Sequence, residues 1–153
     1  MKRKILIVED NVGLSQIQKD WLSRAGYDAV TAMSEPIARS LIRKTQFDLI
    51  LSDVRLPEGD GISLLEWLRK EKKDIPFIIT TEFVSVPDVV RTIKLGARDY
   101  LPKPVHREHL LELAEDVFHP VATVRKQERQ LFRRISPMIL KVEKFARLVA
   151  PSD

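Results

Sequence analysis

The sequence predicts an α/β fold with a doubly wound parallel sheet, and three observations lead to that prediction. Short apolar runs alternate with helical patterns five times before residue 120, as expected of βαβ units. The run at residues 4–8 is almost continuously apolar, which is typical of a central strand buried on both faces. The chain has 153 residues, of which 44% are hydrophobic, enough for one ordinary domain and an appendage.

The five expected strands are short, and they cover residues 4–8, 27–31, 47–53, 76–81 and 98–101. Asn11 is a suitable N-cap for the helix after the first strand. Ile17 and Leu22 belong to the apolar positions that recur at helical spacing there, so we expect them to face the sheet. Gly26 then ends the helix as a C-cap.

Four further helices are expected, one after each later strand. Ser34 caps the second helix, in which Ile37 is expected to face inward. Residues 56–61 form a tight turn before the third helix. Ser85 caps the fourth helix, and residues 106–118 form the fifth.

The pattern changes beyond Pro120, so we divide the chain into residues 1–120, 121–135 and 136–153. The middle segment has heptad-like apolar spacing, which indicates an exposed linker helix or a short coiled coil. Residues 121–153 carry 8 Lys and Arg against 3 Asp and Glu, whereas residues 1–120 carry 18 against 19. Such a basic run is usually a solvated helix face, and nucleic-acid contact is the alternative interpretation.

Several kinds of protein are disfavoured by composition. The chain has no cysteine, which excludes a disulfide framework and fits a reducing cytoplasm. It has no apolar run of about 18 residues that could span a bilayer, and Glu9 and Asp10 interrupt the first apolar run too early for a signal peptide. We interpret His106, His109 and His119 as surface or capping residues, because no further ligand recurs at a metal-binding interval.

Four of the apolar runs end in polar groups that suit phosphate chemistry. Glu9 and Asp10 follow the first strand, and Asp53 ends the third. Thr81 ends the fourth, and Lys103 follows the fifth. Because the carboxyl ends of parallel strands lie at one edge of a sheet, we expect these side chains to share a pocket.

The expected pocket suits a divalent cation and a transferable phosphoryl group. An Asp carboxylate such as Asp53 can attack phosphorus and form an acyl phosphate. Mg²⁺ can screen its charge, with Asp10 as a ligand, Glu9 nearby and a carbonyl from the following turn. Thr81 and Lys103 can then donate to phosphoryl oxygens.

These residues, together with Pro57, Gly61 and the stretch at residues 96–104, resemble the receiver domain of two-component response regulators over roughly residues 3–120. The resemblance implies a flavodoxin-like sheet of five strands with five helices. It also implies that Asp53 accepts a phosphoryl group from the phosphohistidine of a sensor histidine kinase, without turnover as an enzyme. The peptide bond before Pro104 is expected to be cis.

The same resemblance assigns roles to individual residues. It implies Mg²⁺ bound by Glu9, Asp10, Asp53 and the backbone carbonyl of Arg55. It implies that Thr81 and Lys103 bind the phosphate. Thr81 and Tyr100 resemble the switch pair of the family, in which Thr81 moves inward and Tyr100 fills the vacated space.

One position departs from the family pattern. The residue after Thr81 is generally small, but here it is Glu82, followed by Phe83. A carboxylate beside the phosphoryl site adds like-charge repulsion. Our hypothesis is that Glu82 slows phosphorylation, dephosphorylation or both, for instance by pairing with Lys103. The alternative is that Glu82 points to solvent.

Residues 136–153 resemble the start of the central ATPase domain of nitrogen-regulator-type, sigma-54-dependent activators, although the chain contains no G-x-x-x-x-G-K-[ST] motif. We therefore expect a cytoplasmic receiver and linker from a transcriptional activator. It would form a homodimer through the fourth helix, fifth strand, fifth helix and linker. DNA would be contacted only through further domains, and no membrane contact is expected.

Other functions stay open at this point. The chain can be a receiver-like interaction module that is poorly phosphorylated, or a stand-alone single-domain regulator. A nucleic-acid binder using the basic tail is a third hypothesis. A phosphohydrolase is disfavoured, because the sequence shows no second nucleophile or base suited to turnover.

Overall fold

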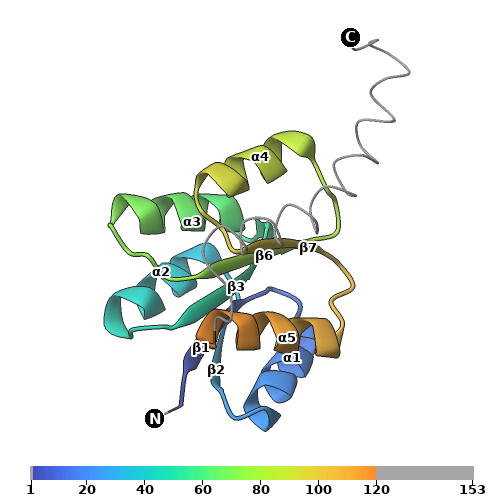
Figure 1. The fold of residues 1–153 in the computed structure, drawn as a ribbon. Helices are drawn as coiled ribbons and strands as arrows, with labels where there is room; N and C mark the ends of the chain where they lie inside the picture. Colours follow the sequence, from blue (N-terminus) through green and yellow to red (C-terminus); the bar gives the residue numbers. More distant parts are fainter. Residues whose placement is uncertain (1, 120–153) are drawn as a thin grey trace, which may run out of the picture.

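The computed structural model describes residues 2–119, which form a parallel five-stranded sheet between two layers of helices (Figure 1). The strands of the sheet are β1 (Lys4–Val8), β2 (Asp28–Ala32), β3 (Leu49–Asp53), β6 (Phe77–Thr81) and β7 (Asp99–Pro102). Their order across the sheet is β2-β1-β3-β6-β7, with every neighbouring pair parallel. The predicted doubly wound, flavodoxin-like sheet is therefore confirmed.

Five helices of the described region cover the two faces of this sheet. One face carries α1 (Val12–Arg24) and α5 (Arg107–Phe118), and the other carries α2 (Glu35–Lys44), α3 (Gly61–Lys70) and α4 (Val86–Lys94) (Figure 1). Each face has its own apolar core, as a sheet buried on both sides requires. Among residues 2–119, no helix has the length and apolarity needed to cross a bilayer.

Two residues expected to face inward lie at the surface instead. Ile17 and Ile37 are each 48% exposed. The buried stripe of α1 contains Ser15, Gln18 and Leu22. Successive helix residues differ by ~100° in direction, so a stripe centred on these positions leaves Ile17 outside. In α2 the buried stripe runs through Ala38 and its neighbours a turn away, which likewise leaves Ile37 outside.

The connection after β3 contains a small hairpin that the sequence pattern presents only as a turn. Its strands are β4 (Arg55–Leu56) and β5 (Gly59–Asp60), which pair antiparallel. The first strand has the expected boundaries, and those of the other four agree to within two residues, as is usual for such assignments. The linker at residues 121–135 and the segment at 136–153 lie outside the described residues.

In the last turn of α3, Arg69 connects this helix to the end of α4. Its guanidinium donates to the backbone carbonyls of Lys73 at 2.8 Å, Ile75 at 3.2 Å and Leu95 at 2.8 Å. A longer bond of 3.3 Å reaches the carbonyl of Gly96. One side chain thus donates to backbone carbonyls of the loop after α3 and of the residues that follow α4.

Candidate metal and phosphate site

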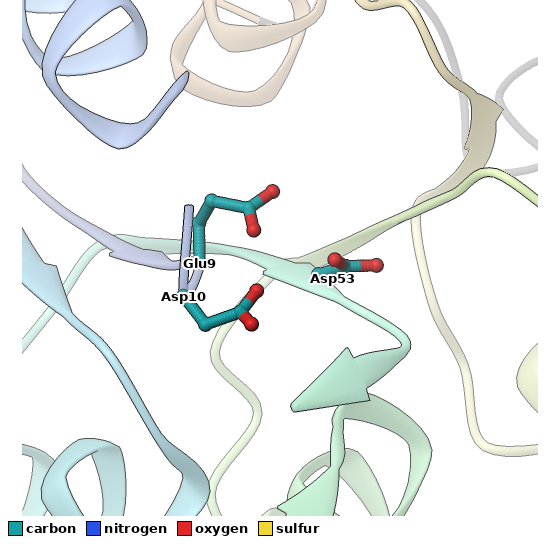
Figure 2. Close-up of side chains that lie close together, drawn as sticks. All are labelled: Glu9, Asp10 and Asp53. Atoms are coloured by element: carbon teal, nitrogen blue, oxygen red, sulfur yellow. The ribbon is translucent and has the colours of Figure 1, made fainter. Parts of the chain in front are cut away.

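Three carboxylates meet at the carboxyl edge of the sheet. Glu9 and Asp10 follow β1, and Asp53 ends β3 (Figure 2). Because Val8 lies opposite Ser52 in the parallel register, the next residues along the two strands are brought side by side. One carboxylate oxygen from each of the three residues lies within 4.8 Å of the other two.

Lys103 reaches this carboxylate cluster from the end of β7. Its Nζ donates to Glu9 Oε1 at 2.5 Å and to Asp53 Oδ2 at 2.9 Å. The side chains of Lys103, Glu9 and Asp53 are only 10%, 3% and 10% exposed. These ion pairs are therefore largely shielded from solvent. The peptide bond between Lys103 and Pro104 is cis, as the family resemblance implied.

Burial and pairing shift the pKa values of two groups at this site. Burial raises the pKa of Glu9, against hydrogen bonds from Lys103 and the Asn11 amide that lower it. Burial acts to lower the pKa of Lys103, but hydrogen bonds to Glu9 and Asp53 outweigh it and raise that pKa. Lys103 is therefore a cation at neutral pH, and its ammonium forms hydrogen bonds with two carboxylates.

This donor set fits Mg²⁺. Hard divalent cations prefer oxygen ligands, and Mg²⁺ commonly combines one or two carboxylates with retained water. Glu9 and Asp53 are buried, whereas Asp10 is exposed and open to water. The Arg55 amide donates to Asp53 Oδ1 at 3.4 Å, which leaves Oδ2 with Lys103. Within residues 2–119 no histidine belongs to such a cluster, and His106 lies exposed at the start of α5.

The N-terminus of α3 approaches Asp53 closely because residue 61 is glycine. A Cβ on Gly61 would lie 2.2 Å from the Asp53 carbonyl oxygen and 2.9 Å from Ser52 Oγ. The Gly61 amide donates to the Val54 carbonyl at 2.8 Å. Asp60 caps α3 by accepting the Ser63 amide at 2.6 Å. The segment after Asp53 is thus packed tightly against the end of β3.

On the other side of Asp53, Thr81 uses its hydroxyl within its own loop. Thr81 Oγ1 donates to the Phe83 carbonyl at 3.0 Å and accepts the Phe83 amide at 3.1 Å. The Phe83 ring is 59% exposed, and the Arg55 guanidinium lies 4.5 Å from its centre. Glu82 is exposed, and none of the salt bridges in residues 2–119 includes it. The expected pairing of Glu82 with Lys103 is therefore not found, because Glu9 and Asp53 occupy that ammonium.

Tyr100 lies entirely inside the protein. It is 0% exposed, so its ring is buried in this structure. Burial raises its pKa to about 12, and the Ser85 backbone and Thr81 side chain oppose this shift. Within residues 2–119 no group meets its hydroxyl with full hydrogen-bond geometry.

Sequence reasoning missed Glu35, which reaches the hairpin after Asp53 from α2. Glu35 Oε2 accepts the Asp60 amide at 3.1 Å, although 25 residues separate the two. A Glu in the first turn of a helix is explained by the helix dipole alone. No local signal in the sequence therefore distinguishes Glu35 from an ordinary helix-start residue.

Comparisons of the sequence give a consistent family. The family model of the response regulator receiver domain matches residues 5–115. The transcriptional regulatory protein GlrR of Escherichia coli (strain K12) is 33% identical over 150 residues, covering 97% of this chain and 34% of GlrR. ZraR of Salmonella typhimurium is 40% identical over 114 residues, covering 74% of this chain and 26% of ZraR. The chain thus spans about a third or less of the length of these curated relatives.

Solved structures agree with this family. The non-phosphorylated receiver domain of HemR from Leptospira biflexa superposes with a TM-score of 0.73 at 35% identity, covering 80% of this chain and 98% of that one. A CheY-like receiver domain protein from Methanospirillum hungatei gives a TM-score of 0.73 at 29% identity, with coverages of 85% and 99%. By sequence and by fold, this chain belongs to the response regulator receiver domain family.

Proposed function

We propose that Asp53 accepts a phosphoryl group from the phosphohistidine of a sensor histidine kinase, and that this modification controls a transcriptional activator. The observation that carries the proposal is the cluster of Glu9, Asp10 and Asp53 with Lys103 bonded to two of its members. Carboxylates alone suit a cation. The buried ammonium adds a donor for an anion, so the pair of features suits a metal-assisted phosphoryl acceptor.

The proposed transfer uses the groups in place. An Asp53 oxygen attacks phosphorus, and the bond from phosphorus to the donor imidazole nitrogen breaks, leaving its electron pair on that nitrogen. When bound by Glu9, Asp10, Asp53 and the Arg55 carbonyl, Mg²⁺ would offset the negative charge of the phosphoryl group. Lys103 exchanges its bond with Asp53 for one with a phosphoryl oxygen, and Thr81 donates to another. The acceptor is consumed once, so no turnover is expected.

Phosphorylation of Asp53 is tested with acetyl phosphate and Mg²⁺ as a kinase-independent donor. We expect the intact mass of the wild-type protein to increase by one phosphoryl group, and Asp53→Asn to show no increase. Asp20→Asn is the matched control, because Asp20 is a surface residue paired with Arg24. Equal uptake by Asp53→Asn, or no uptake by a wild-type protein that binds Mg²⁺, would contradict the proposal.

The proposed conformational change after phosphorylation involves the switch pair, Thr81 and Tyr100. A phosphoryl oxygen on Asp53 competes with Phe83 for the Thr81 hydroxyl, which frees the loop before α4. Exposed Val90 and Ile93 on α4 offer apolar surface for a homodimer that also uses β7, α5 and the linker. Beryllofluoride-treated protein should therefore sediment as a dimer; a monomer at all concentrations would contradict this part.

The wider context is also a proposal. Relatives that match nearly the whole chain carry the name transcriptional regulatory protein and are about three times as long. This supports a role in transcription regulation, and we propose a cytoplasmic, sigma-54-dependent activator in which DNA is contacted only by other domains. A gene that encodes a phosphate-binding loop after residues 136–153 would agree with it, and a different domain there would contradict it.

The second candidate function is a receiver that is phosphorylated slowly. Two side chains beside the site support this candidate. Glu82 is exposed next to Thr81, and Phe83 packs on Arg55. Both side chains can therefore hinder the approach of a phosphoryl donor or of water to Asp53. Glu82→Ala and Phe83→Ala should each accelerate phosphoryl gain or loss. Unchanged rates in both variants would refute a modulating role.

A further inference from the structure

Glu35 is a buried carboxylate whose contacts lead to the loop after Asp53. It is the first residue of α2 and is 5% exposed. Its Oε1 accepts from Arg39 Nη2 at 2.5 Å, and its Oε2 accepts the Asp60 amide at 3.1 Å. Burying a carboxylate is costly unless it is paired and hydrogen-bonded, and here both oxygens have partners.

The Glu35 carboxylate fits against bare backbone in the β4–β5 hairpin. A Cβ on Gly59 would lie 1.7 Å from Glu35 Oε2 and 2.8 Å from its carboxyl carbon. Gly59 also has φ of +152°, a conformation that side chains with a Cβ rarely adopt. Only glycine at this position lets the carboxylate reach the Asp60 amide.

The hairpin transmits this contact to the metal and phosphate site. Asp60 lies opposite Arg55 in the β4–β5 pair. The Arg55 amide in turn donates to Asp53 Oδ1 at 3.4 Å. A group that fixes Asp60 therefore also fixes the backbone of Arg55, whose carbonyl is the proposed fourth ligand of Mg²⁺.

We propose that Glu35 is a positioning residue for this site, which holds the β4–β5 hairpin so that the Arg55 carbonyl and Asp53 are in place before Mg²⁺ binds. The inference rests on the proposed function for the identity of the metal. Groups that orient metal ligands typically contribute 10- to 100-fold to affinity. Because Glu35 acts through backbone, we expect an effect of about tenfold.

The Mg²⁺ affinity of four metal-free proteins, measured by isothermal titration calorimetry, tests this role. Glu35→Ala should bind Mg²⁺ about tenfold more weakly than the wild type. Glu35→Gln should bind close to the wild type, because its amide oxygen still accepts the Asp60 amide. Glu66→Ala should be unchanged, since Glu66 also pairs with an arginine, Arg91, but away from the hairpin. Equal weakening in Glu35→Ala and Glu35→Gln would overturn the proposal in favour of a simple charge effect.

Hydrogen exchange of the Asp60 amide in Mg²⁺-free protein gives a readout that does not depend on the metal. We expect faster exchange in Glu35→Ala, protection in Glu35→Gln, and faster exchange in Gly59→Ala, whose Cβ displaces the carboxylate. Wild-type exchange in a folded Glu35→Ala protein would overturn the proposal. If the wild type fails to bind Mg²⁺, the proposed metal role fails, and the exchange data alone decide whether Glu35 holds the hairpin.

Discussion

The two loops that flank Asp53 are held in contrasting ways. The loop after β3 contains a hairpin, a buried Leu56, a helix cap and the bond to Glu35. The loop after β6 exposes Glu82 and Phe83 and is held mainly by the Thr81 hydroxyl. The loop after β3, which is expected to hold the metal, is thus the preformed loop. The loop after β6 is the responsive loop, because it is held by bonds that a phosphoryl oxygen can replace.

The largest effect is expected at Lys103, which joins the two sides. Its backbone amide donates to the Thr81 carbonyl at 2.7 Å, and its ammonium binds Glu9 and Asp53. Lys103→Met should lower the free energy of unfolding in Mg²⁺-free protein by about 3 kcal/mol, because two buried carboxylates lose their cation.

Urea denaturation at neutral pH measures the effect of Lys103→Met. Lys70→Met is the control, since the Lys70–Glu66 pair is exposed and should contribute far less to stability. Equal losses in the two variants would show that the Lys103 ion pairs contribute no more than surface pairs.

Tyr100 reports how well the responsive loop shields the interior at alkaline pH. Its pKa is raised to about 12 in the folded protein, against about 10 in an unfolded chain. Unfolding above pH 10 therefore releases a proton. The stabilisation that comes from the buried, protonated Tyr100 is complete below about pH 10 and is lost as the pH rises toward about 12, up to about 3 kcal/mol.

The comparison of wild type with Tyr100→Phe isolates this proton. Between about pH 8 and about pH 11, the wild type should lose more stability than the variant, because phenylalanine has nothing to ionise. Parallel losses would mean that water already reaches Tyr100, and the responsive loop would be looser than the contacts indicate.

Gly61→Ala tests the tight packing of the preformed loop. Its Cβ would lie 2.2 Å from the Asp53 carbonyl, so we expect a loss of about 2 kcal/mol in chemical denaturation. Gly13→Ala is a matched control inside α1, where the nearest atom is 3.5 Å away. The control should be neutral or slightly stabilising; an equally neutral Gly61→Ala would mean that the close approach is easily relaxed.

The smallest effect is expected for Thr81→Val, which nearly conserves volume but removes the hydroxyl. The loss of its hydrogen bonds to Phe83 should cost about 1 kcal/mol. Amide exchange should accelerate at Phe83 and stay unchanged at Asp60. Acceleration at both amides would show that the two loops move together and would remove the contrast between them.

The residues that meet at the sheet edge were predictable because alternating strand and helix patterns indicate parallel strands, whose carboxyl ends lie at one edge. That Glu9 and Asp53 are direct neighbours depends on β1 lying beside β3, which local patterns do not determine. The bond from Glu35 to Asp60 was not predictable, since it depends on the missing Cβ of Gly59 and on how α2 packs beside the hairpin. The exposure of Ile17 and Ile37 was missed because small or polar side chains occupy the sheet-facing positions of their helices.

Arg69 has a consequence for any movement that begins near Asp53. It fastens the Leu95 end of α4 to α3, while the Val86 end follows the loosely held loop. Because α4 is fixed at its Leu95 end, we expect a displacement of Phe83 to rotate the helix about Leu95 rather than to translate it. The displacement would then be greatest near Val86 and would fade toward Lys94.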